Sequence, residues 1–169
     1  IDACLVGSEM CIRDRLSLAL QKSKIDVGNV AISIPVTSAI IRVVTSPLLK
    51  DEELQKAIET NSLWENLVQL TDNLDDYSIF HQVINRNEKD NTMDILFVGS
   101  KLADINGYVS IVKNSGLNPV IIDVKCFALK SAVDQINQIS KKEEDVNLTA
   151  VLEFGLDENY LMILYDNNP

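Results

Sequence analysis

Residues 94–124 read DILFVGSKLADINGYVSIVKNSGLNPVIIDV, and this stretch decides the fold class of the chain. Residues 94–99 form a short apolar run, which is typical of a buried strand. Between residues 101 and 115 apolar side chains recur at helical spacing, and Gly116 follows where a left-handed cap would end the helix. Residues 119–124 are apolar again and predict a second strand. The stretch therefore predicts a helix that joins two strands and packs against their sheet.

The segments before this stretch predict further strands and helices. Leu16 to Ser23 is a short helix candidate. Val30 to Val44 suits two strands or one long bent strand, because β-branched side chains favour a pleated surface. Pro35 marks an edge, a bend or a turn within it, since its nitrogen cannot donate a hydrogen bond. Asp51 opens a second helix, with acidic residues at the positive end of the helix dipole.

The remaining segments complete the pattern. Residues 77–84 alternate as a strand, and the polar residues 85–92 predict a hairpin loop. Residues 127–139 predict a helix, and residues 149–154 and 160–165 predict a β-hairpin. We expect the inward face of that helix to hold Leu129, Ala132, Val133, Ile136 and Ile139.

This order of elements predicts the α+β class. Two helices are expected against one sheet of mixed direction, and the last helix and hairpin are expected to begin a second unit. The expected boundaries are an extension over residues 1–15, a first unit over residues 16–125, and a second unit over residues 126–169.

The composition excludes several classes of function. The chain has 169 residues, 46% of them hydrophobic, and a formal net charge of −10. So acidic a chain should repel nucleic acids and anionic lipid head groups, which carry the same sign of charge. The longest apolar run, residues 30–41, contains Pro35 and several hydroxyl residues, and it is shorter than the roughly 20 apolar residues of a membrane-spanning helix.

The two ends of the chain carry separate expectations. Residues 4–15, CLVGSEMCIRDR, resemble the conceptual translation of a sequencing adaptor, so we exclude residues 1–15 from fold reasoning; a genuine strand and turn is the alternative. Cys126 is then the one remaining cysteine, which fits a reducing compartment. The chain stops at Pro169, directly after an apolar strand, and we expect the gene to continue on both sides.

Few residues suggest chemistry, and no catalytic residue is predicted. His81 is the one histidine and lies in a strand, where a structural role is favoured over a zinc site. Cys126 has no nearby base and is expected to be a buried small residue, while Trp64 is expected in the core rather than at a partner contact. The acidic runs are expected to be solvated faces or helix starts, and they cover residues 50–53, 72–76 and 141–145.

The turn after Leu152 is the candidate ligand site. Glu153-Phe154-Gly155 is followed by a polar tip and a returning strand. Backbone N–H groups of such a turn could bind an anion, and the carboxylate of Glu153 could hold a metal-bound water. A plain hairpin with a glycine is the alternative. The candidate residues are Glu153, Gly155, Leu156, Asp157, Glu158 and Asn159.

Several segments together resemble the PilM family of type IV pilus assembly proteins, relatives of the actin-like division protein FtsA. Residues 30–35, VAISIP, with Arg42 seven residues later, are similar to the family's opening strand. Asp51 to Ile58 resembles the acidic helix start that follows, and Glu153-Phe154-Gly155 falls where the family carries an Asp-Ile-Gly phosphate loop. The most specific resemblance lies in Asp94–Gly99, Tyr108-Val109, Gly116-Leu117, Pro119, Asp123-Val124 and Ala128-Leu129.

The resemblance implies a fragment of an actin-like, ribonuclease H-like fold. Residues from about 30 to 124 would be the family's inserted subdomain, and residues from 127 on would lead into the second lobe. It also implies a scaffold on the cytoplasmic face of the bacterial inner membrane, with no direct membrane insertion. That scaffold would bind the cytoplasmic tail of a PilN-type membrane protein and could self-associate or contact other assembly proteins. ATP and Mg²⁺ are implied for the intact protein and not for this fragment.

Departures from the family pattern bear on the nucleotide. Glu153 replaces the family's Asp, and Asp157 and Glu158 add negative charge beside an expected triphosphate, which opposes ATP binding. The alternatives are an active actin-like ATPase or switch, the cytoplasmic domain of a type II secretion component, and an FtsA-like division protein.

Overall fold

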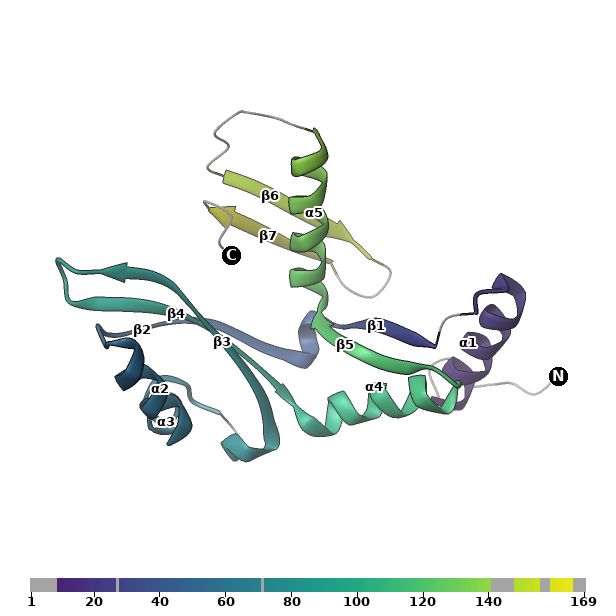
Figure 1. Cartoon of the computed structure of the whole chain (residues 1–169), viewed down its shortest axis with the longest axis horizontal. Helices are drawn as coiled ribbons and strands as arrows, with labels where there is room; N and C mark the ends of the chain where they lie inside the picture. The colour runs from purple at the N-terminus through teal and green to yellow at the C-terminus, as the bar shows by residue number, and fades with distance from the viewer. Residues whose placement is uncertain (1–8, 27, 71, 141–147, 156–158, 166–169) are drawn as a thin grey trace. The chain divides into compact units, whose positions relative to one another are not determined.

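The computed structural model describes residues 9–26, 28–70, 72–140, 148–155 and 159–165. The chain divides into two compact units, residues 1–123 and residues 124–169, and each is described by itself (Figure 1). None of the helices in these described ranges is long and apolar enough to cross a membrane.

The first unit contains four helices and five strands in its described part. In chain order these are α1 (Glu9–Ser23), β1 (Asn29–Ile34), β2 (Ala39–Pro47), α2 (Asp51–Glu59), α3 (Ser62–Leu67), β3 (Tyr77–Asn87), β4 (Thr92–Lys101), α4 (Leu102–Asn114) and β5 (Asn118–Val124). Two short 3₁₀ turns, η1 (Val36–Ser38) and η2 (Leu74–Asp76), precede β2 and β3.

Strand β4 is the centre of a three-stranded antiparallel sheet in the order β2-β4-β3. In its register Phe97 lies between Arg42 of β2 and His81 of β3. Successive side chains of a strand point to opposite faces, so Met93, Ile95 and Phe97 share one face of the sheet. All three are buried, and that face is the core side.

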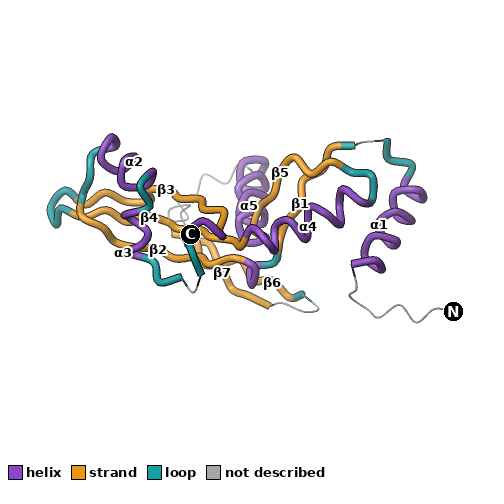
Figure 2. Tube along the Cα trace, turned by 90° about the horizontal axis from the view of Figure 1, so that it is seen from below, coloured by secondary structure: helices purple, strands orange, loops and turns teal. Residues whose placement is uncertain are grey.

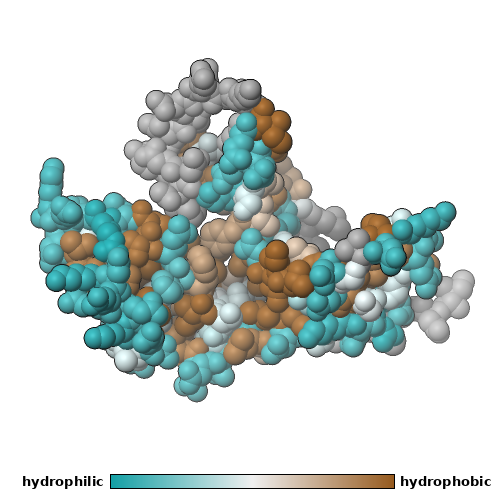
Figure 3. Space-filling view, in the orientation of Figure 1, coloured by the Kyte–Doolittle hydropathy of each residue, from teal (hydrophilic) through white to brown (hydrophobic). Residues whose placement is uncertain are grey.

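Helices α2 and α3 cover the core side of this sheet (Figures 1 and 2). Trp64 of α3 is 1% exposed, and its ring centroid lies 5.1 Å from that of Phe97 and 5.7 Å from that of His81. The start of α2 is held by the side chain of Arg86, which donates to the carbonyl of Leu49 at 2.9 Å. The surface of these two helices away from the sheet is hydrophilic (Figure 3).

The other strands of the first unit form a separate sheet, in which β1 pairs with β5. Helix α4 joins β4 to β5 and contacts α1. It ends at Asn114, and Gly116 follows with a φ of 84°, so the predicted left-handed cap is confirmed. The expectation of one sheet of mixed direction is corrected: β2 leaves β1 after the η1 turn and pairs with β4 instead. The α+β class is confirmed, and two helices do cover one sheet. They are α2 and α3, whereas the predicted helix at residues 101–115 joins strands of two different sheets.

The second unit contains helix α5 (Lys125–Ser140) and a hairpin of β6 (Leu148–Phe154) and β7 (Asn159–Tyr165). The hairpin is antiparallel, as predicted, and places Glu153 opposite Tyr160. Its two faces differ in exposure. Leu164 on one face is buried, while the other face exposes Leu148, Leu152, Phe154, Leu161 and Ile163.

Several predicted boundaries and faces are wrong. Helix α1 begins at Glu9 and not at Leu16, so part of the excluded stretch is helical; that residues 1–15 are foreign stays a prediction. The predicted hairpin loop at 85–92 is shorter, because strand ladders are made by the backbone and polar side chains do not end them. Ile136 and Ile139, predicted to face inward, are 60% and 80% exposed. Helical spacing shows which residues share a face of the helix, but not whether another element packs on that face. The acidic run at 141–145 lies outside the described residues.

Candidate functional site

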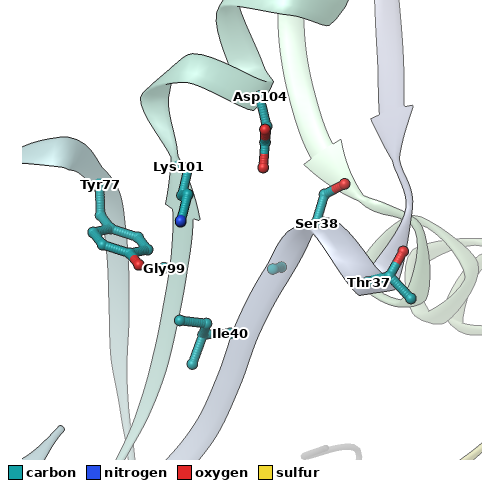
Figure 4. A pocket seen from close by; sticks show the side chains of 8 residues that line it. Thr37, Ser38, Ile40, Tyr77, Gly99, Lys101 and Asp104 are labelled. Carbon is teal, nitrogen blue, oxygen red and sulfur yellow. The ribbon is translucent and has the colours of Figure 1, made fainter. Parts of the chain in front are cut away.

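A pocket lies in the first unit where β2 begins, β4 ends and α4 begins (Figure 4). It is a shallow hollow with about 290 Å³ of empty space, part of which is open solvent. In the figure Tyr77 and Lys101 stand on one side, Ser38 on the other, and Asp104 reaches in from α4. Its full lining is Thr37, Ser38, Ala39, Ile40, Tyr77, Gly99, Lys101 and Asp104.

Gly99 makes the floor of the pocket. It lies on the core side of β4, in register with Ile40 on one side and Ile79 on the other. A Cβ atom at this position would lie 3.0 Å from Cε1 of Phe97 and 3.7 Å from Cδ1 of Tyr77. The ring of Phe97 therefore needs glycine here, and the missing side chain leaves a hollow at the end of the hydrophobic core.

The rim of the pocket is polar and carries both signs of charge. Lys101 forms an ion pair with Asp72, with Nζ 2.6 Å from Oδ2, and the hydroxyl of Tyr77 donates to the same oxygen at 3.3 Å. The hydrogen bond to Asp72 raises the pKa of the Lys101 ammonium above its usual range. Ser38 and Asp104 complete the rim. An apolar floor with a polar rim suits a short apolar side chain whose flanking backbone groups need hydrogen-bond partners.

The structure confirms that Trp64 and Cys126 are buried, as the sequence predicted. Trp64 is in the core, and His81 lies on a strand face beside its ring. Cys126 is buried and not disulfide-bonded. Within the described ranges no three side chains of the metal-ligating types come close enough together to hold an ion.

The predicted ligand loop belongs to the second unit, and its carboxylate is already engaged. Glu153 forms an ion pair with Lys125, the first residue of α5, through Oε1, while Oε2 is buried from solvent. The hydrogen bond from Lys125 holds the pKa of the Glu153 carboxyl below its usual range, burial opposes this shift, and the hydroxyl of Tyr160 adds to it. The side chain of Glu153 is 17% exposed.

These residues do not fit a Mg²⁺ site. Mg²⁺ binds carboxylate oxygens that keep room for several coordinated waters, and here a lysine ammonium and a tyrosine ring surround the carboxylate. Gly155 follows β6, and Asn159 begins β7 and is exposed. The other candidates, Leu156, Asp157 and Glu158, lie outside the described residues. The anion-binding role of the loop stays a prediction.

Sequence reasoning missed the pocket, and it missed that Lys125 pairs with Glu153. A glycine inside a strand is a signal of close backbone or ring approach, and Gly99 carried it. Lys101 and Asp104 gave no signal, because their positions beside Ser38 depend on the pairing of β2 with β4. The pairing of Lys125 with Glu153 likewise depends on how the hairpin packs on α5.

Two solved structures show the class of fold. The chain superposes on a structure described as the PilM–PilN type IV pilus biogenesis complex with a TM-score of 0.72 at 15% identity, covering 100% of this chain and 48% of that one. It also superposes on the cytoplasmic domain of EpsL, an inner membrane component of the type II secretion system of Vibrio cholerae, with a TM-score of 0.59 at 12% identity and coverages of 97% and 56%. The predicted fragment of an actin-like fold is confirmed.

The family follows from the sequence match. The model of the family described as "Type IV pilus assembly protein PilM" matches residues 8–169 of this sequence. The chain therefore belongs to the PilM family of type IV pilus assembly proteins. No curated protein matches the chain. The chain spans about half (48%) of the length of the chain that it matches in the PilM–PilN complex.

Proposed function

We propose that this protein is a scaffold of type IV pilus assembly that binds the cytoplasmic tail of a PilN-type inner-membrane protein. Membership of the PilM family and the likeness to a PilM–PilN complex support the partner. Through that partner the protein would sit on the inner face of the inner membrane. Its net charge of −10 supports attachment through protein rather than through anionic lipid.

The pocket floored by Gly99 is the observation that carries this proposal. It offers an apolar hollow ringed by Ser38, Lys101 and Asp104, which suits one anchoring side chain of an extended peptide. The ammonium of Lys101 on its rim is already held in an ion pair by Asp72. We therefore propose the pocket as a binding site for a peptide side chain.

Fluorescence anisotropy of a labelled peptide tests this proposal. The peptide covers the cytoplasmic tail of the PilN-type protein from the same organism, and the full-length protein is the titrant. We expect saturable binding, and we expect Ser38→Trp to weaken it by about tenfold or more because the indole would fill the pocket. Ser33→Trp, on the exposed part of β1 and outside the pocket, is the matched control and should bind as the wild type does.

Two results would count against the proposal in different ways. Absence of peptide binding together with robust ATP turnover would refute the scaffold and favour the actin-like ATPase. Equal binding by Ser38→Trp and the wild type would keep the partner but remove the pocket as its site.

A further inference from the structure

The start of α5 has an unusual charge. Lys125 is its first residue, and no acidic residue lies in the first turn. A helix N-terminus carries partial positive charge, so a lysine there is unfavourable unless a carboxylate from elsewhere compensates it. Glu153 of β6 is that carboxylate, and its Oε1 contacts Lys125 Nζ.

The position of Glu153 is equally unusual for a carboxylate. Along β6 it shares a face with Val151, and across the hairpin that face continues into Tyr160, Met162 and the buried Leu164. A carboxylate on such a largely apolar face needs a cation close by. Lys125 meets that need, and the depressed pKa of Glu153 is consistent with it. Each of the two residues thus explains the position of the other.

A divalent ion at Glu153 would have to displace the ammonium or share the carboxylate with it. Displacement would break the contact between Lys125 and Glu153 at the helix start, and sharing would bring two cations together. We infer that Lys125 is the built-in counter-cation of Glu153, so that the pair fixes the hairpin on α5 and the loop after β6 does not recruit Mg²⁺ through this carboxylate.

Manganese binding measured by electron paramagnetic resonance tests the metal side of this inference. Mn²⁺ is added to the full chain, alone and with ATP, and the free ion is measured. We expect Glu153→Gln to leave the amount of bound Mn²⁺ unchanged in both conditions. Mn²⁺ binding by the wild type that is lost in Glu153→Gln would overturn the inference, whereas binding unaffected by that change would place the ion elsewhere.

A thermal double-mutant cycle tests the pairing itself and does not depend on metal. We expect Lys125→Met and Glu153→Gln each to lower the melting temperature, and the double variant to lower it by clearly less than the two shifts combined. Lys130→Met is the matched control, because Lys130 lies in the same helix and pairs with Asp134. Its effect should add to that of Glu153→Gln. Additive shifts for Lys125→Met would show that the pair does not act as a unit and would overturn the inference.

Discussion

Replacing Phe97 by alanine is the sharpest test of which side of the three-stranded sheet is the core. Its side chain is 0% exposed and touches the ring of Trp64. Burying about 150 Å² of aromatic surface at about 25 cal/mol per Å² corresponds to about 4 kcal/mol. Replacing a buried Phe by alanine typically costs about 3–5 kcal/mol, so we expect Phe97→Ala to lower the free energy of unfolding by that amount.

Phe80→Ala is the matched control, since Phe80 lies on β3, opposite Val98, and points to the other face. It is 58% exposed, and its loss should cost about 1 kcal/mol or less. The assay is urea unfolding followed by the fluorescence of Trp64, the one tryptophan, which lies in this core. If Phe80→Ala and Phe97→Ala lowered the free energy of unfolding equally, the placement of α2 and α3 on the sheet face that holds Phe97 would be refuted.

Three further outcomes follow from local geometry. Gly116→Ala should destabilise the first unit by about 1 kcal/mol, because alanine is strained at a φ of 84°. Gly107→Ala should stabilise the same unit by about 0.5–1 kcal/mol, because Gly107 lies in α4 and no atom lies within 4 Å of an added Cβ. Urea unfolding measures both changes. The lowered pKa of Glu153 contributes stability that is complete above the unfolded value near 4.5 and is lost as the pH falls through the lower folded value. In acid unfolding the wild type should therefore lose this part of its stability as the pH falls below about 4.5, whereas Glu153→Gln should lack that pH-dependent loss. Phe154→Lys, at a residue 82% exposed, should reduce binding of a hydrophobic dye without lowering the melting temperature.

Local patterns in the sequence were sufficient for most of the elements. Apolar spacing predicted α4, and the glycine at 116 predicted its end, because both depend on residues within a few positions of one another. The hairpin of β6 and β7 was predicted for the same reason. Trp64 was expected in the core, since a single large aromatic among apolar neighbours gains most from burial.

The division into sheets could not be read locally. A strand followed by Pro35 and a second apolar run is compatible with one sheet or two. Which of these forms depends on the strands that β1 and β2 pair with, and those strands, β5 and β4, lie far along the chain. The candidate site depended on the same long-range pairing. Gly99 forms a pocket because β2 and β3 place Ile40 and Tyr77 around it, and Glu153 is paired because the hairpin brings it beside Lys125.

The two resolved pKa shifts run in the direction opposite to the one that a general acid or base needs. A general acid or base at neutral pH needs a pKa moved toward 7, so burial or like charges must destabilise its charged form. In this chain the pKa of Lys101 is raised and that of Glu153 is lowered, and each shift stabilises the charged form through an ion pair. Lys101 supports the rim of the pocket, and Glu153 fixes a hairpin to a helix. Charges held in this way fix the local geometry of the surface, which is compatible with the scaffold role proposed above.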